Sequence, residues 1–137
     1  MTKLFIDTNV ILDLLLDREF SREADNLLSL NANENFTFFI SALSYINAHY
    51  QLKKRYPDHM CRLLLANTKK NLHTIDLTDL NLEESLVSDF KDFEDAVQYQ
   101  SALYAKADHI ITRNQKDFKK STIAVCTPTE FLFQLAK

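Results

Sequence analysis

Three acidic residues stand where the sequence pattern changes from strand to helix or loop. Asp7 directly follows the apolar run Leu4–Ile6, Asp95 lies in the acid-rich first turn of an expected helix, and Asp117 follows a later apolar run. Each acid alone could simply cap a helix or occupy a solvated turn. Placed together, however, such carboxylates form a site for a hard cation such as Mg²⁺ or Mn²⁺, which prefers oxygen ligands.

Other oxygen-bearing side chains accompany these acids. Asp92 precedes Asp95 by three residues and is expected near the same face of the helix, which makes it a further candidate metal ligand. The polar side chains beside the acids, as candidate supports of the site, are Thr8, Asn9, Thr112 and Asn114. The chemistry that fits such a site is phosphodiester hydrolysis, in which the metal activates a water molecule and offsets charge on the phosphate.

Composition excludes several other chemistries. The chain contains no glycine, so it lacks the phosphate-binding loops and the nucleophile elbow that require glycine. Its two cysteines and four histidines have no zinc-site spacing, and we expect both cysteines to be free, buried thiols. No apolar run is long enough for a transmembrane helix, and the N-terminal pattern is not that of a signal peptide. We therefore expect a cytoplasmic protein without a membrane partner.

Strand and helix patterns alternate along the whole chain. Strands are expected at 3–7, 36–40, 72–75, 109–112 and 122–126, and helices at 8 to about 18, 21–30, 41–55, 58–70, 81–87, from Asp92, and from Thr127. This alternation predicts one α/β domain over residues 1–137, with a mainly parallel five-stranded sheet covered on both faces. Ligands of such sheets bind beyond the carboxyl ends of the strands, where Asp7 is expected.

The charge distribution adds a candidate surface for nucleic acid. The net charge is −3, but four basic residues surround Asp117, namely Arg113, Lys116, Lys119 and Lys120. A second basic group, residues 53–55, is typical of a helix C-terminus. Basic side chains beside a metal site could hold an RNA backbone through its phosphates, although charge alone does not distinguish RNA from DNA.

The segments FIDTNVILDLL and DFEDAVQYQSALYAKADHIITRNQKDF resemble the PIN domain, and within it the toxin-type nucleases of the VapC kind. The resemblance covers essentially the whole chain. It implies a Rossmann-like, three-layer α/β/α fold and a Mg²⁺- or Mn²⁺-dependent ribonuclease, usually dimeric and often silenced by an antitoxin protein. It also implies that Asp7, Asp95 and Asp117 are the catalytic acids, with Asn114 beside them and Thr8 and Asn9 in support.

One position departs from the pattern that the resemblance implies. The family commonly has a glutamate where this chain has Asn47, which offers a carbonyl oxygen but no negative charge. Asp92 or Glu94 could compensate for that charge. The alternative reading is therefore a catalytically weak PIN-like binding module with an acidic pocket. A small-molecule phosphatase is disfavoured, because the first strand lacks a D-x-D pattern.

Dimerisation is an expectation from the resemblance alone. The candidate surfaces are the helices at Val10–Leu16 and Ser21–Leu30, because Leu12 and Leu16 add apolar surface beyond the expected core stripe.

Overall fold

A computed structural model describes residues 1–137 and contains one five-stranded sheet in the order β3-β2-β1-β4-β5. All four strand pairings are parallel. The strands are β1 (Thr2–Ile6), β2 (Phe36–Ser41), β3 (His73–Ile75), β4 (His109–Ile111) and β5 (Ala124–Cys126). The expected parallel α/β sheet is thus confirmed. The strand order changes direction at β1, which lies between β2 and β4.

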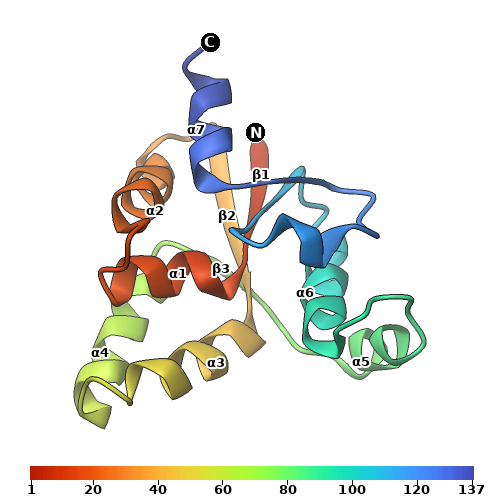
Figure 1. Ribbon diagram of the computed structural model, residues 1–137, viewed down its shortest axis with the longest axis horizontal. Helices are drawn as coiled ribbons and strands as arrows, with labels where there is room; N and C mark the ends of the chain where they lie inside the picture. Colours follow the sequence, from red (N-terminus) through yellow and green to blue (C-terminus); the bar gives the residue numbers. More distant parts are fainter.

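Helices cover both faces of the sheet, as Figure 1 shows, with α5 and α6 on one side and α1, α2 and α7 on the other. The α-helices are α1 (Thr8–Leu15), α2 (Ser21–Leu28), α3 (Ala42–Leu52), α4 (Asp58–Lys69), α5 (Asp79–Leu86), α6 (Phe93–Tyr104) and α7 (Pro128–Leu135). Two short 3-10 helices, η1 (Ser29–Ala32) and η2 (Gln115–Phe118), complete the chain. None of the helices is long and apolar enough to cross a membrane.

The alternation of side chains along β1 explains the layers. Leu4 and Ile6 are fully buried in the cluster formed with α1, α2 and α7. Phe5 points to the opposite face, where it packs with Tyr99 of α6 and with Phe118. Because successive strand residues face opposite sides, a continuous apolar strand requires helices on both faces.

Capping residues in the sequence predicted most of the helix starts correctly. Asp92 caps α6, and Thr127 begins α7 with a full capping box followed by Pro128. The expected start of the fifth helix at Asn81 was wrong, because Thr78 Oγ1 accepts the Asn81 N–H and is the actual cap. The side chain of Asn81 is instead buried and donates to Ser101 Oγ.

The first helix is shorter than expected. It ends at Leu15, and Asp17 adopts a positive φ of 51°, a left-handed conformation that an α-helix cannot continue. Leu12 is only 6% exposed and packs with Ala48, Leu52 and Cys61, so the expectation that it adds apolar dimer surface was wrong. Both Cys61 and Cys126 are free and buried, as expected.

Candidate active site

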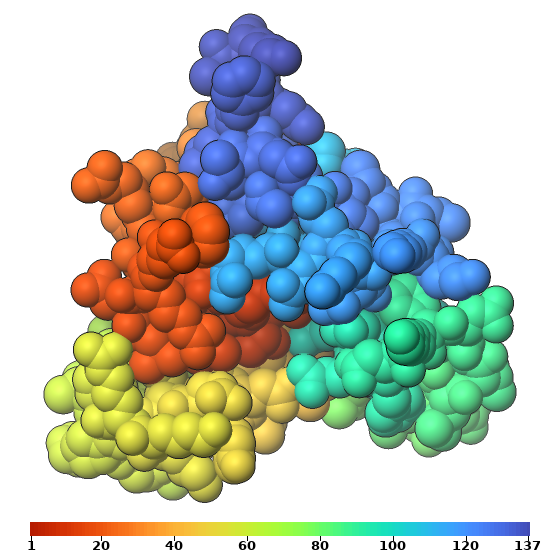
Figure 2. All heavy atoms as spheres, viewed as in Figure 1, coloured from red at the N-terminus to blue at the C-terminus, as the bar shows by residue number.

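Four acidic side chains line one pocket at the carboxyl edge of the sheet. The pocket has a volume of about 370 Å³ and receives Asp7 from the end of β1, Glu94 and Asp95 from the first turn of α6, and Asp117 from η2. Asn9, Asn47 and Asn114 line it as well. We call this the acidic pocket. In Figure 2 the surface is indented at the lower edge, between the yellow α3 and the green-blue α6.

Asp7 is the most enclosed of these acids. Its carboxylate accepts a hydrogen bond from the Thr8 backbone N–H at 2.8 Å, which caps α1, and one from Thr112 Oγ1 at 2.8 Å. It is 8% exposed. Burial raises the pKa of Asp7 to about 6, against the opposing effect of these two hydrogen bonds. Asp7 therefore both caps the helix and presents a destabilised charge to the pocket.

The contact between Asp7 and Thr112 lies where the strand order changes direction. Ile6 of β1 pairs with Ile111 of β4, so the residues that follow the two strands meet at one point. Asn9 strengthens the junction, because its Nδ2 donates to Thr112 Oγ1 at 3.2 Å and lies 3.4 Å from Asp7 Oδ2. Thr112 Oγ1 in turn accepts the backbone N–H of Asn114 at 3.1 Å. Such a switch point is where ligands of open α/β sheets bind.

Asp95 lines the same pocket as Asp7, from the first turn of α6. Its pKa is raised to about 7, mainly by burial and then by the negative charges of Asp92, Asp117 and Asp7. Its backbone N–H donates to Asp92 Oδ2 at 3.1 Å, so Asp92 acts as the helix cap. A carboxylate with a pKa near neutrality is typical of sites that bind cations or exchange protons.

Glu94 lies beside Asn47, the position at which this chain lacks an acidic side chain. Asn47 Nδ2 donates to Glu94 Oε1 at 2.9 Å, and both residues line the acidic pocket. Burial, followed by the charge of Asp92, raises the pKa of Glu94. Asp92 does not line the acidic pocket. Of the two acids that could compensate for Asn47, Glu94 is therefore the one beside it; a helix register counted from the Asp92 cap could have indicated this.

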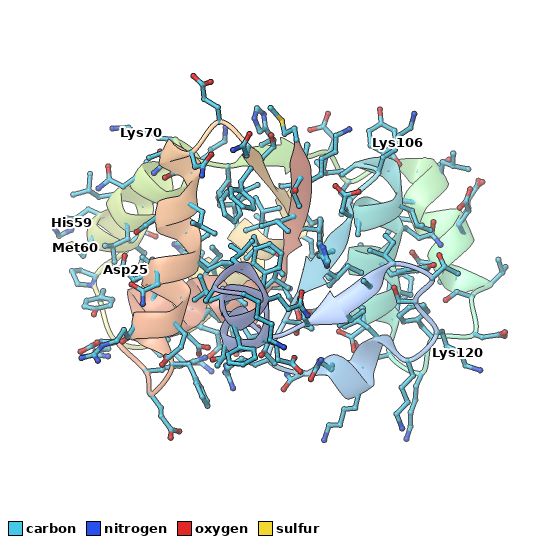
Figure 3. The ribbon with its side chains drawn as sticks, turned by 90° about the horizontal axis from the view of Figure 1, so that it is seen from above. Asp25, His59, Met60, Lys70, Lys106 and Lys120 are labelled. Atoms are coloured by element: carbon cyan, nitrogen blue, oxygen red, sulfur yellow. The ribbon has the colours of Figure 1, made fainter.

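A second pocket adjoins the first and carries lysines. Its volume is about 460 Å³, and Asp95 and Asp117 belong to both pockets and form the wall between them. The basic side chains that line it are Lys91, Lys116, Lys119 and Lys120. We call it the lysine pocket. Figure 3 shows Lys120 extending from the molecular surface.

Arg113 does not join these lysines. It lies outside both pockets, and its Nε donates to the carboxylate of Asp13 in α1. The structure thus brings Lys116, Lys119 and Lys120 together beside the acids, whereas Arg113 is paired with α1.

Sequence patterns gave no sign of a buried polar network behind the pocket. Gln98 Nε2 donates to Thr8 Oγ1 at 3.2 Å and to Ser44 Oγ at 3.0 Å, and the two hydroxyls share a hydrogen bond of 2.7 Å. Thr8 follows Asp7, Ser44 precedes Asn47 by three residues, and Gln98 follows Asp95 by three. The network therefore links the three helices that carry these site residues.

The donor set suits a hard cation in kind. It consists of carboxylate and amide oxygens, without histidine or cysteine. In this conformation, no group of three or more His, Cys, Asp or Glu side chains is arranged to hold a metal ion. Chemically, the arrangement offers a concentration of negative charge next to a positively charged rim.

Known structures resemble this fold over most of its length. A toxin–antitoxin complex from Klebsiella pneumoniae contains a chain with 27% identity and a TM-score of 0.66, covering 91% of this chain and 97% of that one. VapBC2 from Rickettsia felis, bound to a promoter DNA fragment, gives 17% identity and a TM-score of 0.65 over 91% and 97%. VapC20 from Mycobacterium tuberculosis, a sarcin–ricin loop cleaving toxin, gives 14% and 0.62 over 78% and 86%.

No curated protein sequence matches the chain significantly. The family model of the PIN domain, in contrast, matches residues 3–116, which include most of β1, the first turn of α6 and the start of the loop after β4. With the parallel sheet and the strand-end acids in place, the match is decisive: this chain belongs to the PIN domain family.

Proposed function

We propose that this protein is a metal-dependent endoribonuclease that hydrolyses RNA phosphodiester bonds with Mg²⁺ or Mn²⁺. One observation carries the proposal: an acid that follows β1 and acids of α6 and η2, far apart in sequence, line a single pocket. Raised pKa values of about 6 for Asp7 and about 7 for Asp95 support it, because a cation would relieve the repulsion that helps to raise them.

Asp7, Asp95 and Asp117 would hold the cation, and the amide oxygens of Asn47 and Asn114 would complete or support its shell. When bound, the ion supplies a water of lowered pKa and offsets charge on the phosphate. Thr112 and the Thr8 N–H orient the Asp7 carboxylate through their hydrogen bonds. Asn9 holds the Thr112 hydroxyl in place for this contact. Glu94 adds the negative charge that Asn47 lacks.

The lysine pocket would bind the RNA backbone. Lys116, Lys119 and Lys120 are exposed and adjoin the acidic pocket through Asp95 and Asp117. Phosphates held there would leave the next phosphodiester within reach of the acids, and such contacts add affinity without sequence information.

The biological role that fits best is that of a toxin with a separate antitoxin protein. The likeness to the Klebsiella pneumoniae toxin–antitoxin chain over 97% of its length supports this role. We further propose that residues 1–137 form a single domain and that the protein acts as a homodimer. We also propose that it cleaves RNA in the cytoplasm.

Cleavage of a labelled, structured RNA tests the proposal. We expect cleavage with MnCl₂ or MgCl₂ and none with EDTA. Asp7→Asn, Asp95→Asn and Asp117→Asn should each lower the rate by more than about 100-fold, since even residues that only support a metal ligand affect activity by about 10–100-fold. The matched control is Asp25→Asn, an exposed acid of α2 that lines neither pocket and lies on the opposite side from Lys120 in Figure 3, which should cleave at the wild-type rate.

A second candidate function follows from Asn47. If this amide leaves the pocket with too little charge, the chain is a PIN-like binding module that binds RNA without cleaving it. Calorimetric titration with MnCl₂ separates the two candidates. No binding at millimolar metal, together with intact RNA, would favour the module.

A further inference from the structure

An ion pair between a buried carboxylate and a partly exposed guanidinium joins α1 to the loop that follows β4. Asp13 is 1% exposed, and its carboxylate accepts a hydrogen bond from Arg113 Nε. Arg18 Nη1 lies 3.8 Å from the same carboxylate. The Arg113 guanidinium also lies over the Phe20 ring, 5.5 Å from its centre. A carboxylate this deep in a protein requires such partners, because an unpaired buried charge is strongly unfavourable.

The same helix face contacts this loop at a second point. Asn9, one turn before Asp13, accepts the backbone N–H of Arg113 through its Oδ1 at 3.3 Å. Its Nδ2 donates to Thr112 Oγ1. One face of α1 thus fixes Thr112 and Arg113 together, by an amide at one turn and a carboxylate at the next. The loop continues to Asn114 and Asp117, which line the acidic pocket.

Arg113 is poorly placed to bind RNA. The lysine pocket does not include it, and it lines instead a separate cavity of about 290 Å³ with Phe20 and Glu23. Its charge is already satisfied by a buried carboxylate. A phosphate that bound Arg113 would have to compete with Asp13 and leave this buried carboxylate with only the longer contact to Arg18, which is energetically costly.

We propose that Asp13 and Arg113 are positioning residues that hold the loop from Thr112 to Asp117 against α1, so that Asn114 and Asp117 face Asp7. The activity readout of this inference rests on the proposed nuclease function. The pair contacts neither pocket directly, and it acts through the backbone of the loop.

The experiment replaces the pair as a unit. In the double variant Asp13→Leu/Arg113→Met, apolar side chains of similar volume remove both charges, a change that folded proteins commonly tolerate. We expect thermal unfolding close to wild type. In metal-free protein, amide hydrogen exchange measured by NMR should become about tenfold faster at Arg113 and Asn114, because their N–H groups mark the attachment of the loop. RNA cleavage should lose kcat by about tenfold with KM unchanged.

Lys119→Gln is the matched comparison for the role in RNA binding. It should raise KM and reduce the salt dependence of RNA binding, and it should leave kcat and the exchange rates unchanged. The double variant should instead lower kcat, raise the exchange rates and leave KM unchanged. If instead the double variant raises KM, weakens the salt dependence and keeps kcat, Arg113 binds RNA and the inference is overturned.

Unchanged exchange at Arg113 and Asn114 in a stably folded double variant would also overturn it. If the double variant does not fold, Arg113→Lys takes its place. It keeps the charge but not the geometry of the guanidinium, and it must show the same faster exchange and lower kcat. Should the wild type cleave no RNA with any divalent metal, the nuclease proposal fails, while the exchange rates still decide whether the pair positions the loop.

Discussion

Asn47 of α3 donates a hydrogen bond of 2.9 Å to Glu94 of α6 across the acidic pocket. The contact pairs a neutral amide with a carboxylate whose pKa is raised by burial and by Asp92. The amide gives the pocket a donor where an acid would have added repulsion. The first turn of α6 thus provides the charge that α3 lacks.

Removing the charge of Glu94 should therefore weaken metal binding. We expect Glu94→Gln to lower Mn²⁺ affinity by about tenfold, because it removes a carboxylate from the acidic pocket. Asp92→Asn should change affinity by less than about threefold, since Asn also caps helices and residue 92 lines the lysine pocket instead. Calorimetric titration with MnCl₂ measures both. A larger loss for Asp92→Asn would identify Asp92 as the ligand, as the sequence predicted.

The raised pKa of Asp7 predicts a pH-dependent stability. Between its ordinary pKa of 3.8 and its folded value of about 6, the folded protein binds more protons than the unfolded chain. The free energy of unfolding therefore falls as the pH rises through this range. A shift of this size corresponds to about 3 kcal/mol. In EDTA, Asp7→Asn should be more stable than wild type by up to that amount at pH 8, and equally stable at pH 4.

Urea denaturation at the two pH values measures this difference. Asp25→Asn is the control, because it makes the same substitution at an exposed acid of α2 outside the acidic pocket. Equal stability of Asp7→Asn and wild type at pH 8 would mean that the Asp7 charge is not destabilised by burial.

Lysines of the lysine pocket should act through phosphate contacts. Lys120→Gln should weaken RNA binding at low salt and reduce the slope of log affinity against log salt by about 1. Lys70→Gln is the matched control, because Lys70 is also exposed but lies on the opposite side of the molecule in Figure 3. Fluorescence anisotropy with labelled RNA, from low to high salt, gives both slopes. Identical slopes for the two variants would mean that the lysine pocket does not bind the RNA backbone.

The buried network of Thr8, Ser44 and Gln98 should contribute to stability. Ser44→Ala removes an acceptor of Gln98 Nε2 and the partner of the Thr8 hydroxyl. We expect the free energy of unfolding to fall by about 1–3 kcal/mol, the usual effect of leaving buried polar groups unpaired. Ser29→Ala, at an exposed serine of η1, should change it by less than about 0.5 kcal/mol. A similar small effect for both would show that water replaces the lost hydroxyl.

Local patterns predicted the parallel sheet and most helix starts. A strand buried on both faces appears as a continuous apolar run, and a helix cap depends on residues about three apart in sequence. The apolar run before Asp7 and the Thr127 capping box are such signals. The placement of Asp7, Asp95 and Asp117 at one sheet edge also followed from topology, since parallel strands end on the same side.

Only the tertiary structure decided which side chains meet across that edge. Helix register and packing placed Glu94 in the acidic pocket and Asp92 outside it. A buried carboxylate on another element drew Arg113 away from the lysines, and helix packing buried Leu12. The sequence by itself determined the elements and their order, because these depend on residues near one another in the chain. Contacts between distant segments depend on how whole helices pack against one another, and local sequence patterns do not predict this packing.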